Sequence, residues 1–190
     1  VPVNSSKELV DYARANPGKL AYGSYGVGST FHLVGELIKQ VAGIDMLHVP
    51  YRGTAPALTD LISGNIDAMF DNVGTSLSLH REGRIRILAT ASMQRLPVLP
   101  NIPTISESGF AGFRSVTWYA LVAPRGTPDS IVEKINNDVL AILQEADVRR
   151  KLEDLSLQPV GGTPRQTAQF FQEETDVWSE VIKDANVQAQ

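Results

Sequence analysis

The sequence predicts an α/β fold built on a mainly parallel sheet, and three observations support this. Short apolar runs of strand length alternate with amphipathic segments of helix length over residues 20–91. Glycines stand where the predicted helices end, at Gly43, Gly64 and Gly83. Loops rich in glycine, serine and threonine open the helices that follow the strands. Alternating strands and helices of this kind form a parallel sheet with crossover helices.

The front part of the chain carries the regular alternation. The predicted helices are 5–16, 29–42, 55–62 and 75–81, and the predicted strands are 20–24, 46–49, 66–70 and 85–91. Ser5 and Glu8 form a capping box at the start of the first helix. The apolar positions of the second helix recur at the spacing that places them on one face.

The back part follows a different plan. It is predicted to contain strands at 113–122 and 157–160, and helices at 127–145, 146–155 and 164–183. Thr127 is the expected cap of the first of these helices, with Pro128 at its first position. The helices carry apolar stripes, yet this part offers little strand on which to pack them.

Composition excludes several classes of function. The 190 residues are 43% hydrophobic and 20% charged, as in ordinary globular proteins. A net charge of −4 argues against a nucleic-acid partner, which requires a basic face. The absence of cysteine excludes disulfides and thiol chemistry and argues against a zinc site. We expect no metal and no cofactor.

Three loops are expected at the carboxyl ends of the strands, where ligands bind in open α/β sheets. They read SYGVGST, PYRGTA and DNVGTS, at residues 24–30, 50–55 and 71–76. The first loop comes close to a phosphate-binding P-loop, but Ser29 stands where the P-loop lysine is required. Helix N-termini bind anions through unpaired N–H groups. The loops therefore suit a carboxylate, although glycine and serine there can equally serve only to cap the helices.

The sequence allows more than one role for each of two charged residues in these loops. Arg52 can clamp a carboxylate through two hydrogen bonds, or it can be a solvated surface residue. Asp71 can pair with Arg52, accept an amine from a ligand, or cap the following helix. Of these roles, capping or pairing is favoured for Asp71.

The sequence contains no recognisable catalytic set. The three histidines lack metal-ligand spacing, and no serine lies in a G-x-S-x-G elbow. Glu107, Glu173 and Glu174 read as surface charges. Trp118 and Tyr119 read as core residues of a strand, with the alternative that one of them lines the ligand site. An enzyme on this fold would have only Asp71 and His32 as acid or base.

Five segments in a fixed order carry a resemblance to one family. They are NPGKLAYGSYGVGSTFHLVGE, HVPYRGTAPALTDLISGNIDAMFDN, GRIRILATASMQRLPVLPNIPTISESG, VTWYALVAPRGTPDSIVEKIN and DVRRKLEDLSLQPVGGTP. From about Val1 to Val181 the chain resembles the periplasmic substrate-binding receptors of tripartite tricarboxylate transporters, the Bug or TctC family. The resemblance implies a type II periplasmic binding protein, in which two α/β lobes close on a small acid.

The resemblance also implies which residues bind the ligand. They are Ser24, Gly26, Gly28, Ser29, Thr30, Tyr51, Arg52, Gly53, Thr54, Asp71 and Asn72. His32 matches a helix-opening histidine of the family, which implies positional support rather than ligand contact. The implied ligand is a dicarboxylate or an acidic amino acid, and the implied partner is the membrane permease of the transporter.

The family has a further N-terminal part that this sequence lacks. Residues 1–121 are therefore expected to form one complete lobe with hinge segments, and residues 122–190 a helical return segment of an incomplete second lobe. The expected location is the periplasm, with the signal peptide not present in this chain. The incomplete lobe predicts pairing with a second copy or with the missing half. The alternatives are a non-transport assembly module and, less favoured, an enzyme on the same fold.

Overall fold

The computed structural model describes residues 1–188, and the chain forms two compact units. Unit 1 holds Val1–Thr117 together with residues 180–188, and unit 2 holds Trp118–Ser179. The chain thus passes from unit 1 to unit 2 once and returns within its last long helix. The expected boundary between residues 121 and 122 concerns the lobes of a complete receptor and stays a prediction.

All seven predicted helices are present, and none of their ends shifts by more than three residues. Unit 1 contains α1 (Ser6–Ala15), α2 (Thr30–Ala42), α3 (Thr54–Ser63) and α4 (Val73–Arg81). Unit 2 contains α5 (Asp129–Ile142), α6 (Ala146–Asp154) and most of α7 (Pro164–Asp184). Gly43 and Gly64 end α2 and α3 in the left-handed conformation, with φ of 60° and 78°.

Three strands form a parallel sheet in the order β2-β1-β3. They are β1 (Ala21–Ser24), β2 (Leu47–Pro50) and β3 (Ala68–Met69). The central strand, β1, pairs along its whole length with β2, and two of its residues pair with β3. This confirms the parallel α/β prediction for the front part of the chain.

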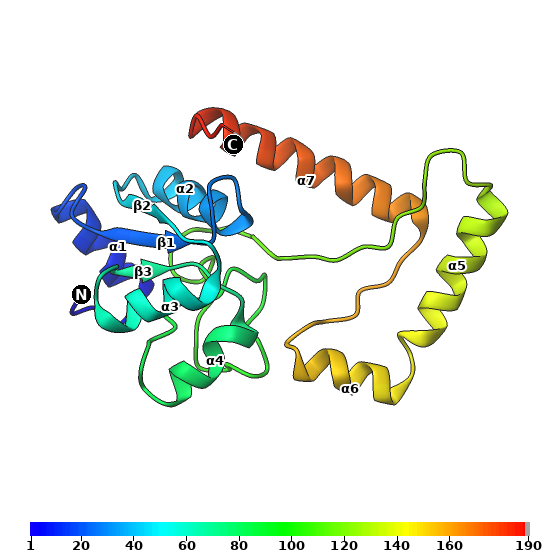
Figure 1. Cartoon of the computed structure of the whole chain (residues 1–190), viewed down its shortest axis with the longest axis horizontal. Helices are drawn as coiled ribbons and strands as arrows, with labels where there is room; N and C mark the ends of the chain where they lie inside the picture. The colour runs from blue at the N-terminus through cyan, green and yellow to red at the C-terminus, as the bar shows by residue number, and fades with distance from the viewer. Residues whose placement is uncertain (189–190) are drawn as a thin grey trace. The chain divides into compact units, whose positions relative to one another are not determined.

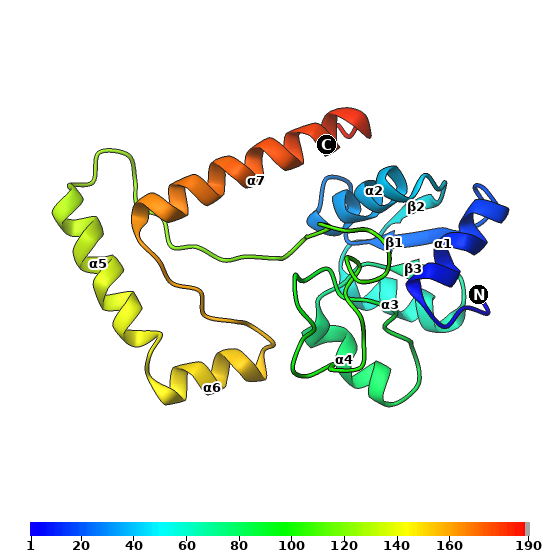
Figure 2. The ribbon, with the colours of Figure 1, turned by 180° about the vertical axis from the view of Figure 1, so that it is seen from behind.

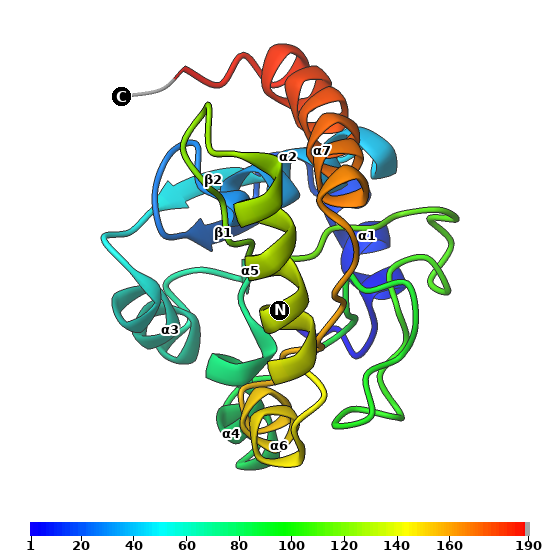
Figure 3. The same ribbon diagram turned by 90° about the vertical axis from the view of Figure 1, so that its right-hand side faces the viewer.

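Helices α2 and α3 pack on opposite faces of this sheet (Figures 1 and 3). Successive side chains of β1 point to opposite faces of the sheet, and each face contacts one of the two helices. Tyr22 is fully buried against Gly35 of α2, and a methyl group added at Gly35 would lie 2.2 Å from the tyrosine ring. The next residue, Gly23, faces the other way, where an added methyl would lie 2.6 Å from Ile66 and 3.7 Å from Ala57 of α3. Both faces of β1 are therefore covered.

Three predicted strands are wrong. Residues 85–91 make only an isolated bridge, between Thr90 and Thr104, and residues 113–122 and 157–160 form no strand. These segments have strand-like composition, but a strand also requires a hydrogen-bonded neighbour. Within residues 1–188 no further strand lies beside them. The predicted cap at Thr127 is also wrong, since Pro128 is the N-cap residue of α5.

Unit 2 is helical, with α5 leading into α6 through a short turn (Figure 2). No residue of α5 or α6 is buried. Three aromatic rings of this unit contact one another: the ring of Trp118 stacks on Phe171 at 5.1 Å and meets Phe170 edge-on at 5.5 Å. Trp118 is nevertheless 43% exposed, so its predicted core position is wrong. Glu174 is buried there and accepts hydrogen bonds from the indoles of Trp118 and Trp178. The interpretation of Glu174 as a surface charge is therefore wrong.

Among the described residues, none of the helices combines the length and the apolar character that crossing a membrane would require.

We expect Gly35→Ala to destabilise unit 1 by about 1–3 kcal/mol, the usual cost of overpacking a core. Alanine favours helices over glycine by about 1 kcal/mol, so helix propensity alone predicts the opposite sign. The steric cost dominates because the added methyl meets the rigid ring of buried Tyr22. Urea denaturation gives the free energy of unfolding. Gln40→Ala, on the exposed side of the same helix, is the control and should change it little. A Gly35→Ala protein as stable as the control would contradict the close approach of α2 to β1.

Candidate functional site: three loops at the carboxyl edge of the sheet

The three predicted loops follow the three strands of the sheet and open three helices. Strand β1 ends at Ser24, β2 at Pro50 and β3 at Met69, and all run in the same direction. Helices α2, α3 and α4 begin four to six residues beyond these ends. The parallel pairing thus places the loops and the three helix N-termini along one edge of the sheet, as the sequence predicts.

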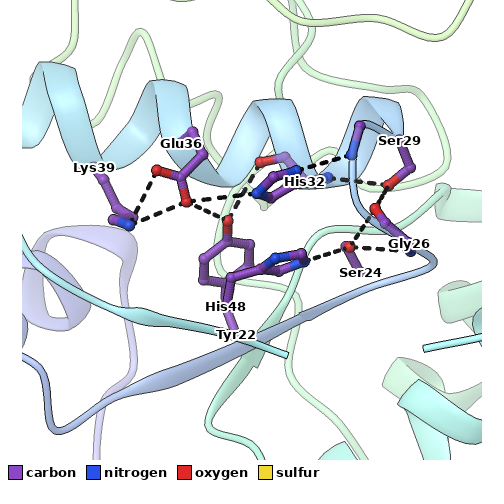
Figure 4. A network of polar contacts seen from close by, with 9 residues as sticks. Tyr22, Ser24, Gly26, Ser29, His32, Glu36, Lys39 and His48 are labelled. Carbon is purple, nitrogen blue, oxygen red and sulfur yellow. Dashed lines mark hydrogen bonds and ion pairs between the residues drawn. The ribbon is translucent and has the colours of Figure 1, made fainter. Parts of the chain in front are cut away.

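The first loop is held by hydrogen bonds within itself (Figure 4). The hydroxyl of Ser29 accepts from the N–H of His32 at 3.3 Å and donates to the carbonyl of Gly26 at 2.7 Å. The hydroxyl of Ser24 lies 2.7 Å from Nε2 of His48, and the N–H of Gly26 donates to it at 3.3 Å. Ser24 is fully buried. Ser24 therefore lies beneath the loop and supports the backbone of the other predicted ligand-binding residues of that loop.

Two histidines lie side by side under this loop. Nδ1 of His32 accepts from the N–H of Gly28 at 3.0 Å, which is the positional support expected of His32. The ring of His48, from β2, stacks on that of His32 with centroids 3.9 Å apart and planes 15° apart. The ring of Tyr22 also stacks on that of His48, with centroids 5.0 Å apart.

A carboxylate completes the polar network. Glu36, one turn beyond His32 on α2, accepts from the hydroxyl of Tyr22 at 2.7 Å and from the ammonium of Lys39 at 3.0 Å. It lies 3.9 Å from Nε2 of His32. Figure 4 shows these groups in a row along the inner side of α2.

Burial shifts the proton affinity of both histidines. Burial first, and then the neighbouring His32, lower the pKa of His48 to about 4, while Glu36 opposes the shift. Burial also lowers the pKa of His32 below its ordinary value, with Glu36 again opposing. Burial and the hydrogen bond to Glu36 raise the pKa of Tyr22. The network is therefore built around neutral imidazoles at neutral pH.

The second loop leaves its helix uncapped. Gly53 is the N-cap residue of α3, with φ of 141°, and it has no side chain to satisfy the first N–H groups of the helix. Arg52 is exposed and forms no ion pair within residues 1–188. Tyr51 donates its hydroxyl to Asp60 at 2.8 Å. Thr54 is the first residue of the helix.

The third loop contains a carboxylate that binds hydroxyl groups of its own helix. One oxygen of Asp71 accepts from the hydroxyls of Thr75 and Ser76 at 2.5 and 2.6 Å, but neither oxygen accepts a backbone N–H of α4, so the favoured capping role is not realised within the described chain. The other oxygen is buried and has no partner within the described chain. The N-cap residue of α4, Asn72, makes no side-chain capping hydrogen bond. Arg52 and Asp71 form no ion pair, so the pairing alternative is not realised.

Sequence reasoning missed Tyr22, Glu36 and His48 as parts of this site. One signal was present, because His32 and Glu36 are four residues apart and so share a helix face. The link to His48 and Tyr22 depends on strand pairing, which places Tyr22 directly beside His48. Within residues 1–188 no cluster of three or more histidine, aspartate or glutamate side chains is arranged to hold a metal ion.

The lowered pKa of His48 predicts a stability that depends on pH. Unfolded His48 takes up a proton near its ordinary pKa of 6.5, whereas folded His48 does so only near 4. The free energy of unfolding should therefore be largest above pH 6.5 and fall as the pH is lowered toward about 4. Urea denaturation across this range should show a smaller fall for His48→Gln than for the natural chain. His80→Gln, outside the network, is the control. An NMR titration that gave His48 an ordinary pKa would contradict the prediction.

Comparisons with known proteins agree with this architecture. Residues 1–187 match the profile of the tripartite tricarboxylate transporter family receptor. A protein from the tcbD-tcbE intergenic region of Pseudomonas sp. strain P51 is 39% identical over 183 residues, which are 96% of this chain and 54% of that protein. Protein BugT of Bordetella pertussis is 32% identical, with 96% of this chain and 56% of that protein covered.

Solved structures give the same result. Rpa4515 of R. palustris, determined with adipate, is 38% identical with a TM-score of 0.82, covering 98% of this chain and 62% of that one. MatC of Rhodopseudomonas palustris, with bound malate, is 33% identical with a TM-score of 0.73, covering 95% and 63%. The periplasmic binding protein BugD is 31% identical with a TM-score of 0.81, covering 100% and 64%.

The chain spans about half the length of most of the curated relatives it matches. A shorter relative from the clcB-clcD intergenic region of Pseudomonas knackmussii is 34% identical, with 83% of this chain and 94% of that protein covered. The family match extends over nearly the whole chain, including the three loops and both units. The chain therefore belongs to the tripartite tricarboxylate transporter receptor family, whose solved members include periplasmic solute-binding proteins.

Proposed function

We propose that the chain binds a small dicarboxylate at the carboxyl edge of its sheet. One observation carries the proposal: three helix N-termini lie along this edge, and neither α3 nor α4 has a side-chain cap. Their first N–H groups are free to bind an anion. Each contact between a charge and a helix N-terminus stabilises by about 0.3–1 kcal/mol when exposed, and by up to about 2 kcal/mol when partly buried.

The second and third loops supply different binding groups. The N–H groups at the start of α3 and α4 hold one carboxylate, and exposed Arg52 adds the only full positive charge of the three loops. The partnerless oxygen of Asp71 accepts a hydroxyl or ammonium group next to that carboxylate. A dicarboxylate is the preferred ligand and an acidic amino acid the alternative. The relatives solved with adipate and with malate support a ligand of this class.

The family membership extends the proposal to transport. As a receptor of this family, the chain would deliver its ligand in the periplasm to the membrane permease of a tripartite transporter. It would do so without catalysis, because relatives of known structure are binding proteins and His32 and His48 support the backbone of the loop.

A second candidate function is assembly through unit 2. The segment after Trp118 and the loop before α7 expose large apolar side chains: Tyr119 is 76%, Leu121 72%, Val122 70% and Val160 94% exposed. Exposed apolar surface of this extent favours association. We infer that unit 2 pairs with a second copy.

Replacing the first residue of α4 with proline tests the binding proposal. Proline is tolerated at this position but lacks an N–H, so Val73→Pro removes one donor and keeps the helix. Asn72 has φ of −71° and ψ of 140°, the conformation that a residue before proline prefers. Titrating ¹⁵N-labelled protein with malate or adipate gives Kd from the amide shifts. We expect a Kd about tenfold higher, because one hydrogen bond to a charged group is worth about 1.5–3 kcal/mol.

The matched control is Ser6→Pro, which makes the same change at the first residue of α1, away from the three loops. It should leave the Kd unchanged. The shifts of the natural chain should concentrate on the first residues of α3 and α4. Shifts confined to other parts of the chain, or none at millimolar ligand, would contradict the proposal.

Sedimentation velocity tests the assembly proposal. At tens of micromolar the natural chain should contain a dimer whose fraction rises with concentration. Leu121→Glu should shift it to monomer, because a charge placed in a buried apolar interface is costly. Lys134→Glu, an exposed charge on α5, is the control. A natural chain that remains monomeric throughout would contradict pairing.

A further inference from the structure

One hydrogen bond of the first loop depends on which ring nitrogen of His32 carries the proton. The N–H of Gly28 donates to Nδ1 of His32, so this nitrogen carries no proton and the ring proton is on Nε2, toward Glu36. An added proton can go only to Nδ1. It would turn the acceptor into a second donor facing the N–H of Gly28, and this hydrogen bond would be lost.

His48 makes a positive charge on His32 less favourable. His48 is stacked on His32 at 3.9 Å, and its Nε2 contacts the hydroxyl of Ser24 that anchors Gly26. A proton on either ring places a positive charge directly against the other. The two histidines thus hold opposite ends of one loop, His48 at its start and His32 at its end.

The other titratable groups near the pair do not offset such a charge fully. Glu36 is the only carboxylate that the described structure places against His32, and it is already shared with Lys39 and with the hydroxyl of Tyr22. Lys39 contributes a positive charge on the same helix face. His32 itself is 7% exposed, so water cannot solvate an imidazolium there.

We propose that His32 and His48 are positioning residues that hold the first loop in its ligand-binding conformation only while both rings are neutral, so that acidification releases the loop and weakens carboxylate binding. This regulation rests on the function proposed above. It concerns the backbone of residues 25–29, which follows the central strand and so lies beside the N-termini of α3 and α4 at the same sheet edge. Loss of the Gly28 hydrogen bond frees that segment, and ordering a mobile segment beside a bound ligand reduces the affinity.

The test replaces His32 by residues that separate its hydrogen bond from its titration. In His32→Asn, the side-chain oxygen takes the place of Nδ1 as an acceptor and does not titrate. In His32→Leu, the acceptor is lost at every pH. His80→Asn removes a histidine outside the pair and is the control. Malate binding is measured by ¹⁵N NMR about one unit above the ordinary histidine pKa of about 6.5 and again at about pH 4, near which folded His48 takes up its proton.

We expect the natural chain and His80→Asn to lose about tenfold more affinity on acidification than His32→Asn, because one hydrogen bond of the loop is lost only in the former two. His32→Leu should bind weakly at both pH values, and His32→Asn should recover part of that loss. Protonation of malate itself affects all variants alike, so the comparison between variants isolates the protein. Equal pH dependence in the natural chain and His32→Asn would overturn the proposal.

A readout without ligand separates this proposal from the function on which it rests. The amide signals of Gly26 and Gly28 should shift and broaden on acidification in the natural chain, and much less in His32→Asn. If these amides respond as expected while malate binds to no variant, the proposed function fails and the loop switch remains. If the amides keep their shifts while malate binds, the switch is wrong and the proposed function stands.

Discussion

The position of β1 between two parallel neighbours is the constraint on which the site depends. Its pairing with β2 and β3 brings three loops to one edge, and its two faces are occupied by Tyr22 against α2 and Gly23 against α3. A longer side chain at Gly23 or Gly35 would push a helix away from the sheet. The close packing of these two helices fixes where their N-termini lie, and hence where an anion would bind.

Beneath the first loop, the same packing creates a second requirement. Tyr22 is buried beside His48, so the polar groups around it must satisfy one another away from water. Ser24, His32, Glu36 and Lys39 provide those partners. One network therefore supports the sheet, the start of α2 and the loop together. Because of this coupling, a proton added to the buried His32 ring is expected to change the conformation of the first loop, even though the ring itself is not proposed to contact the ligand.

The two units differ in how completely they are packed. Unit 1 contains nearly all of the buried apolar residues, whereas α5 and α6 of unit 2 bury none. In unit 2 the described contacts centre on Trp118, Phe171 and the buried Glu174, which join the extended segment to α7. The apolar side chains left exposed elsewhere in the unit are the physical basis for expecting association.

The sequence by itself determined the helices, their glycine ends, the three glycine- and hydroxyl-rich loops and the family, because these depend on local periodicity and on motif order. It also predicted a local role for Asp71, but the carboxylate binds the hydroxyls of Thr75 and Ser76 and does not cap the N–H groups of α4. Only the tertiary structure decided which extended segments become strands. Residues 85–91, 113–122 and 157–160 have strand-like composition, but pairing depends on neighbours distant in the chain. The contact of His32 with His48 and Tyr22 was decided in the same way, since sheet pairing brings together rings that the sequence keeps apart.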